Sequence, residues 1–249
     1  MQTYPMRLWR GVVDFITPPR CLSCRDPVGE PASLCPACWP SLRQIDDPVC
    51  EVMGTPFAYD QGQGALSVIA LRDPPPWNRA RAAVAFDEAS RALVHALKYH
   101  DTQEAGLLMG RMMARAGRVL LGDADVLVPV PLHPLRLWQR RFNQSGYLAQ
   151  RLAMQSGKPW RGDLLARVKA TRPQVGLDSR ARLKNLRGAF RVEPENHVHI
   201  AGRKILLVDD VLTTGATSAA CAQALKQAGA AQVDVLIFAL VLNPARLHM

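Results

Sequence analysis

The chain has 249 residues, of which 48% are hydrophobic and 21% charged, and its formal net charge at pH 7 is +10. This length and apolar content suffice for the core of one α/β domain with a small appendage, so we expect a globular protein. The longest apolar run near the carboxyl end, residues 235–242, is far shorter than the ~20 residues that a membrane-spanning helix needs. Arg7, Arg10 and Asp14 interrupt the amino-terminal apolar stretch and exclude a signal-peptide pattern, so we expect a cytoplasmic protein with no membrane span.

The positive charge is concentrated in one segment. Residues 131–204 hold 16 Lys and Arg against 4 Asp and Glu, whereas the rest of the chain is close to neutral. A basic segment can serve a polyphosphate substrate, a nucleic-acid backbone, or both, and charge alone does not separate these uses. For most individual arginines the alternative is that the side chain simply lies on a solvated surface and binds no ligand.

Five of the six cysteines lie near the amino terminus. Cys21-x-x-Cys24 and Cys35-x-x-Cys38, with ten residues between the pairs, have the spacing of two zinc knuckles. In a small segment with few large apolar residues a bound metal can replace the missing core, and a cytosolic location disfavours disulfides. We therefore expect these four thiolates to hold a structural zinc ion, with an iron–sulfur cluster or a redox pair as the alternative.

A loosely patterned stretch separates the cysteine-rich segment from the rest. It contains Gly62-Gln63-Gly64 and then Pro74-Pro75-Pro76, which stiffens the chain into an extended linker. We place a domain boundary there, with a zinc-binding module and linker at 1–76 and a second domain at 77–249.

The second domain begins with strands and helices in alternation. The pattern predicts strands at 82–86 and 125–130 and helices at 88–99, 104–119 and 143–154. The strand at 125–130 leads into Pro131, Leu132 and His133, where prolines fix a rigid loop, and then into Arg140 and Arg141. For His133, a purely structural hydrogen bond is an equal alternative to ligand binding.

A long basic stretch with few acids follows at 167–191. It contains Lys169 and Arg172 and is punctuated by glycine and proline, which is typical of a mobile lid over a site.

Two carboxylates follow a strongly apolar strand at 205–208. Asp209 and Asp210 come without a turn residue, at the carboxyl end of a strand that we expect to be buried on both faces of a parallel sheet. A small, hydroxyl-rich turn, 213–217, leads into a helix at 218–228 that Gly229 closes, and a last core strand is expected at 233–242.

Strand, acids, hydroxyl turn and helix together predict a phosphate cradle. Helix amino-terminal amides and threonine hydroxyls can donate to a phosphate, while the paired acids can accept from sugar hydroxyls or hold a magnesium hydration shell. A ribose 5-phosphate fits these groups, whereas neither the P-loop motif nor the dinucleotide glycine motif is present. The alternative is an ordinary strand-to-helix turn with two capping aspartates.

The stretch 208–217, Val-Asp-Asp-Val-Leu-Thr-Thr-Gly-Ala-Thr, resembles the phosphoribosyl-pyrophosphate (PRPP) signature of type I phosphoribosyltransferases. Together with the amino-terminal cysteine pairs, it makes nearly the whole chain similar to the ComF family. The resemblance implies an α/β fold of the type I phosphoribosyltransferase kind, a mostly parallel sheet flanked by helices, with a small zinc-ribbon-like module. Many members of that family carry further cysteine pairs, but Met53 stands here where a partner of Cys50 is expected, so we do not predict a second zinc site.

The resemblance also implies roles for individual residues. PRPP, with Mg²⁺, is expected to contact both acids, the turn after them and the loop at 131–133, namely Asp209, Asp210, Thr213, Thr214, Gly215, Ala216, Thr217, Pro131, Leu132 and His133. Catalytic roles would fall on the acids and on basic residues that neutralise pyrophosphate, namely Asp209, Asp210, Arg140, Arg141, Lys169 and Arg172.

Two hypotheses follow from the resemblance. In the first, the protein binds PRPP and acts in the uptake or processing of single-stranded DNA during natural transformation, with competence-machinery proteins as partners. In the second, it is an active phosphoribosyltransferase that joins a nucleobase or another nitrogen acceptor to PRPP and releases pyrophosphate.

Overall fold

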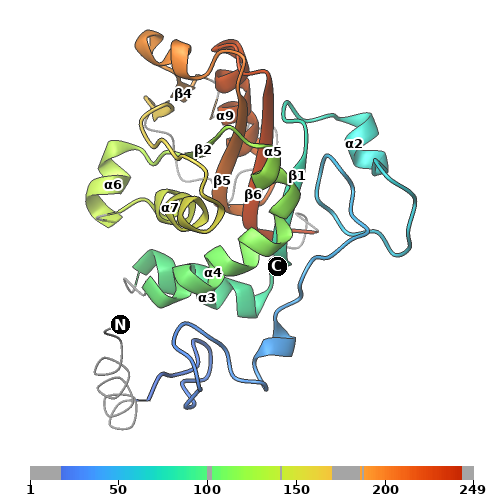
Figure 1. Ribbon diagram of the computed structural model, residues 1–249, viewed down its shortest axis with the longest axis vertical. Coiled ribbons are helices and arrows are strands. Elements are labelled where there is room, and N and C mark those ends of the chain that lie inside the picture. The colour runs from blue at the N-terminus through green and yellow to red at the C-terminus, as the bar shows by residue number, and fades with distance from the viewer. Residues whose placement is uncertain (1–17, 100–102, 141, 170–185, 187, 243–249) are drawn as a thin grey trace, which may run out of the picture.

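The computed structural model describes residues 18–99, 103–140, 142–169, 186 and 188–242. At its centre is a four-stranded parallel sheet in the order β1-β6-β5-β2 (Figure 1). The strands are β1 (Ala80–Ala85), β2 (Val126–Pro129), β5 (Lys204–Leu212) and β6 (Gln232–Leu240).

Strand β5 lies in the middle of the sheet because its side chains are apolar on both faces. Ile205 and Leu207 enter the core on one side, whereas Leu206 and Val208 enter the core on the other, and all four are essentially inaccessible to solvent. A strand that is buried on both sides needs a continuous apolar run rather than an alternating one, as the sequence predicted.

One face of the sheet is covered by the helices α3 (Glu88–Tyr99), α4 (Gln103–Ala116), α5 (Arg118–Asp123) and α7 (Gln144–Ser156). The single helix expected at 104–119 is therefore two helices, which meet at Gly117. A Cβ atom on Gly117 would lie 2.6 Å from the side chain of Leu236 in β6. Glycine thus lets the helical backbone approach the sheet closely and turn there.

The opposite face is covered by α9 (Ala216–Gln227) and by a small antiparallel pair, β3 (Ala166–Arg167) and β4 (Phe190–Arg191). The remaining elements are α6 (Pro134–Arg140) and the 3₁₀ segment η2 (Pro194–His199). The predicted fold class, a parallel sheet flanked by helices with an amino-terminal zinc ribbon, is confirmed. The basic lid predicted between β3 and β4 lies mostly outside the described residues, at 170–185.

The amino-terminal segment, with η1 (Trp39–Ser41) and α2 (Val68–Arg72), runs beside the sheet (Figure 1). Ile45 N–H donates to Ala83 O at 3.1 Å, and Ala85 N–H donates to Arg43 O at 2.8 Å. These bonds cover the outer edge of β1, which would otherwise expose unpaired backbone groups. The contacts cross residue 76, and the division into two domains there stays a prediction.

No helix within the described parts of the chain has the length and apolar character needed to cross a membrane.

Candidate functional site

The two acids lie inside β5 rather than after it. The sequence predicted that the strand would end near Val208, but parallel pairing with β6 continues through Asp209 to Leu212. Both aspartates are consequently buried, with exposed fractions of 8% and 9%. Burying a charged group is costly unless it is paired, so each carboxylate must find partners nearby.

Asp209 is held by neutral donors. Its Oδ1 accepts a hydrogen bond from Ser145 Oγ at 2.8 Å and another from Asp210 N–H at 2.9 Å. Burial, assisted by the negative charge of Asp210, raises the pKa of Asp209 to about 7, while these hydrogen bonds and Lys98 act in the opposite direction. A cation placed near this carboxyl group would lower its pKa and favour the ionised form.

Asp210 is paired with a lysine. Its Oδ2 lies 2.5 Å from Lys98 Nζ, at the carboxyl-terminal end of α3. Neither Lys98 nor Ser145 is among the residues predicted for the site, because nothing in the local spacing links either residue to a strand so distant along the chain. The one available signal for Lys98 was its position as a basic residue in the last turn of the helix predicted at 88–99.

A buried arginine adds a second positive charge. Arg167 of β3 is 8% exposed, and its guanidinium lies over the Phe190 ring, 5.5 Å from the centroid. Burial lowers the pKa of Arg167, as does the nearby Arg136, while the charge of Asp209 acts to raise it. This residue of the basic segment is therefore buried rather than part of a solvated surface.

The predicted phosphate turn connects β5 with α9. Gly215 adopts a left-handed conformation, with φ +77°, and α9 begins at Ala216, two residues earlier than expected. The Thr214 hydroxyl is buried and has no hydrogen-bond partner among the described residues. A buried donor without a partner at a helix amino terminus is suited to a phosphate oxygen.

The loop after β2 lies at the same edge of the sheet. Val130 N–H donates to Val208 O at 2.9 Å, which brings Pro131 next to the acids along the neighbouring strand. Asn143, at which a helix was expected to begin, caps α7, since its Oδ1 accepts from Ser145 N–H at 3.1 Å. His133 Nδ1 accepts from Leu135 N–H at 3.3 Å, so the structural hydrogen bond considered for this histidine is present.

Two of the four basic residues predicted to neutralise pyrophosphate lie within the described part of the chain. Lys169 is exposed just after β3, and Arg140 is the last residue of α6, with a side chain that the structure does not describe. Arg141 and Arg172 lie outside the described residues, so the catalytic roles expected of these four residues stay predictions.

The four expected zinc ligands form one cluster. The sulfur atoms of Cys21, Cys24, Cys35 and Cys38 all lie within 4.8 Å of one another, and Cys24 Sγ is 3.6 Å from Cys35 Sγ. Thiolates bound to tetrahedral zinc at about 2.3 Å lie about 3.8 Å apart, so the donor set fits this metal. Burial acts to raise the pKa of Cys21, but backbone N–H groups of Cys35, Cys24 and Ser23 lower it to about 6, which favours a thiolate.

A second knuckle repeats the backbone of the first. Cys21 N–H donates to Asp26 O at 2.8 Å, and Cys50 N–H donates to Thr55 O at the same distance. The flanking bridges, Arg20 with Pro27 and Val49 with Pro56, also correspond. Residues 48–57 thus have the hydrogen bonding of a zinc knuckle.

The rest of this second ribbon, residues 48–72, corresponds as well. Ser67 N–H donates to Cys50 Sγ at 3.2 Å, as Cys35 N–H donates to Cys21 Sγ at 3.3 Å. Met53, Ser67 and Ala70 therefore occupy the positions of the second, third and fourth ligands. Of the four ligand positions of the second ribbon, Met53 was recognised in the sequence as lacking a thiol, and the structure identifies Ser67 and Ala70 as two more such positions.

Comparison with known proteins agrees with this arrangement. The model of the double zinc ribbon domain family matches residues 12–67. Over 226 residues the chain is 34% identical to the DNA utilization protein YhgH of Salmonella typhimurium, covering 88% of this chain and 95% of that protein. The chain belongs to the ComF/YhgH family.

Another member of the ComF/YhgH family, competence protein F of Haemophilus influenzae, is 27% identical over 227 residues, covering 87% of this chain and 94% of that protein. Among solved structures, orotate phosphoribosyltransferase from Aeropyrum pernix is similar over 64% of this chain and 80% of its own, with 19% identity and a TM-score of 0.32.

We expect the purified protein to contain one zinc ion per chain, because only the first ribbon has four thiolates. Cys21→Ser should remove the metal, whereas the matched variant Cys50→Ser should retain it. Metal analysis by mass spectrometry measures the stoichiometry. Two zinc ions per chain, or a loss of zinc in Cys50→Ser, would contradict the assignment.

We expect the triple variant Met53→Cys, Ser67→Cys, Ala70→Cys to bind a second zinc ion, because the backbone already presents the four ligand positions. The same metal analysis should then give two ions per chain. A matched variant in which Cys50 is also changed to serine should fall back to one. If the triple variant still binds one zinc ion per chain, the backbone similarity of the two ribbons does not include the positions of the ligand atoms.

Proposed function

We propose that this protein binds PRPP with Mg²⁺ at the carboxyl end of β5 and acts in the cytoplasm in the uptake or processing of single-stranded DNA. The observation that supports the first half is a pair of buried acids on β5 followed, in the turn before α9, by the Thr214 hydroxyl, a buried donor with no partner among the described residues. Sugar hydroxyls suit the acids, and a phosphate suits the turn.

The roles of the individual groups follow from their chemistry. The turn 213–217 and the amino terminus of α9 would hold the 5-phosphate, and Asp209 and Asp210 would accept hydrogen bonds from the ribose hydroxyls. Mg²⁺ would neutralise pyrophosphate oxygens, and its water shell would be within the reach of carboxylates such as these. Lys98 already compensates Asp210, so Asp209, with its raised pKa, is the group with most to gain from a ligand.

The DNA half of the proposal is supported by the relatives and by the charge distribution. Proteins of the family carry the names DNA utilization protein and competence protein F. The segment 131–204 contributes 16 positive residues, which can neutralise a phosphate backbone. Competence-machinery proteins are the partners that this role would require.

A second candidate function is an active phosphoribosyltransferase. Arg167 is a buried cation whose pKa is affected by the charge of Asp209. Its guanidinium could stabilise departing pyrophosphate. In this reaction a nitrogen acceptor forms a bond to the anomeric carbon of PRPP while the bond to pyrophosphate breaks. Incubation with PRPP, Mg²⁺ and a panel of nucleobases, followed by a pyrophosphate assay, distinguishes turnover from binding alone.

Replacing both acids should weaken PRPP binding without unfolding the protein. Asp209→Asn with Asp210→Asn removes charge but little volume, and hydrogen bonds to charged groups are worth about 1.5–3 kcal/mol, or about 10- to 100-fold in affinity per site. Calorimetric titration with PRPP and Mg²⁺ measures the loss.

The matched control for the acid pair is Asp234→Asn. Asp234 is also buried in the sheet, but it pairs with Arg79 at 2.6 Å, away from the turn. It should lower the melting temperature and leave PRPP affinity unchanged. If the acids merely cap the turn, the double variant would behave like this control.

Single-stranded DNA should bind in a salt-dependent manner through the basic stretch 167–191. Changing Arg172, Arg180, Arg182 and Lys184 to glutamine should reduce the slope of log affinity against log salt by roughly 0.7 for each lost phosphate contact. Fluorescence anisotropy with a labelled oligonucleotide measures the slope. Arg115→Gln with Arg118→Gln, outside the basic segment, is the control, and a slope that no variant changes would remove DNA from the proposal.

A further inference from the structure

One side chain connects the second ribbon with the phosphate turn. Trp77 is 5% exposed, and its Nε1–H donates to Val52 O, in the second knuckle, at 2.8 Å. The far edge of the same indole lies against Gly215, where an added Cβ atom would be 2.9 Å from Cη2. The indole therefore spans the distance between the ribbon and Gly215, the residue that precedes α9.

The ribbon itself is fixed to the start of β1. Glu51 O accepts hydrogen bonds from Ala80 N–H and Arg81 Nη1, each at 3.1 Å, and the Glu51 carboxylate lies 2.5 Å from Arg81 Nη2. Gly54 packs so closely that a Cβ atom there would lie 2.9 Å from Ala80 O. The knuckle can therefore serve as a firm support for Trp77.

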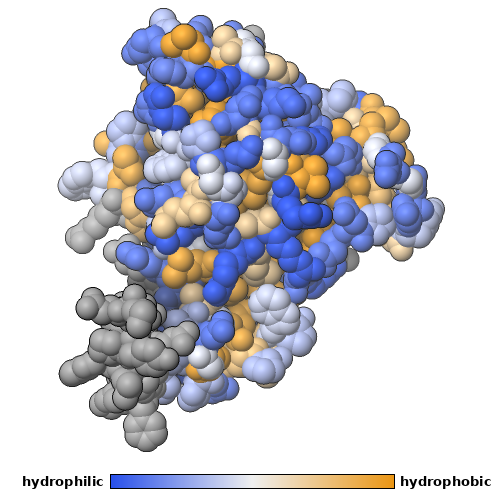
Figure 2. Space-filling model, viewed as in Figure 1, coloured by the Kyte–Doolittle hydropathy of each residue, from blue (hydrophilic) through white to orange (hydrophobic). Residues whose placement is uncertain are grey.

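Packing holds this ribbon in place of a metal. Val52 and Met53 contact the core that contains Trp77, and Ala70 is the buried residue of α2. The neighbours of Ala70, namely Val68, Ile69 and Leu71, are exposed and form part of the apolar surface seen over α2 (Figure 2). The ribbon thus keeps its fold through contacts with the domain that carries the candidate site.

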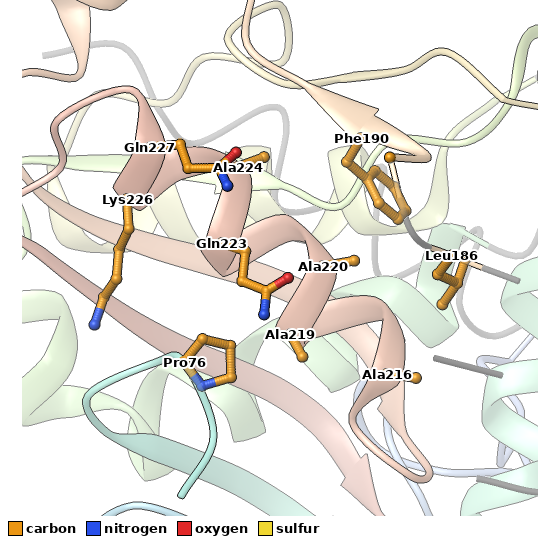
Figure 3. Close-up of a pocket in the computed structure, with 11 residues that line it drawn as sticks. Pro76, Leu186, Phe190, Ala216, Ala219, Ala220, Gln223, Ala224, Lys226 and Gln227 are labelled. Carbon is orange, nitrogen blue, oxygen red and sulfur yellow. The ribbon is translucent and has the colours of Figure 1, made fainter. Parts of the chain in front are cut away.

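The residue before Trp77 reinforces the connection. Pro76 faces the first turns of α9, where it lines a cavity of about 930 Å³ together with Ala216, Ala219 and Gln223 (Figure 3). Residues 76 and 77 thus lie along the beginning of the helix whose amino terminus is expected to receive the phosphate.

We infer that the metal-free second ribbon braces the phosphate turn, with Trp77 as a positioning residue. The inference rests on the proposed function, because the turn is taken to be the phosphate site. Gly215 has a left-handed backbone and no side chain of its own to fix it, so the indole restricts the turn from outside. A turn that is ordered before the ligand arrives loses less entropy on binding.

The test is Trp77→Phe, which keeps a buried aromatic ring but removes the N–H donor and the ring edge that contacts Gly215. Because one neutral hydrogen bond is lost, PRPP affinity should fall about 2- to 13-fold. Hydrogen exchange of amides 213–219 in the ligand-free protein should become faster by a similar factor.

The control is Leu120→Val, which removes a buried methylene group from α5 on the opposite face of the sheet. It should lower the melting temperature while leaving PRPP affinity and exchange of the turn unchanged. If Trp77→Phe behaves like this control, the inference is overturned. If the wild-type protein does not bind PRPP, the proposed function fails, and hydrogen exchange alone still decides whether Trp77 orders the turn.

Discussion

The site depends on the cost of placing two adjacent carboxylates inside a buried strand. Desolvation and mutual repulsion both oppose ionisation, and their effect is visible in the raised pKa of Asp209. The compensating groups come from different elements: Lys98 from α3, Ser145 from α7 and the electrostatic influence of Arg167 from β3. The order of the strands and helices brings these groups together around the two acids.

The two ribbons show two solutions to the problem of folding a segment that has little core. In the first, four thiolates converge closely enough to bind zinc, whose binding energy can replace apolar burial. The second ribbon has the same backbone hydrogen bonds but a single cysteine. Contacts of Val52 and Met53 with the sheet domain support its knuckle. A ribbon that lacks three of the four ligands depends for its fold on the domain it packs against.

The sequence was most informative where a local pattern determines the structure. The buried strand before the acids, the helix that begins near Asn143 and the cluster of four cysteines were predicted correctly, because propensity, capping and metal coordination act over a few residues. The extension of β5 through the acids was not predicted, since it depends on pairing with β6. Lys98 and Trp77 were missed for the same reason, as their partners are distant along the chain.

The contacts of Trp77 bear on how the amino-terminal module relates to the rest of the protein. A module that served only as a separate binding unit would need no contact with the phosphate turn. Here, the turn contains a glycine whose missing Cβ makes room for an indole that is anchored on the second ribbon. Because a side chain at Gly215 would exclude that ring, ribbon and turn are matched in shape, and a change in either one alters the surroundings of the other. The amino-terminal module is in this sense part of the structure that forms the candidate site.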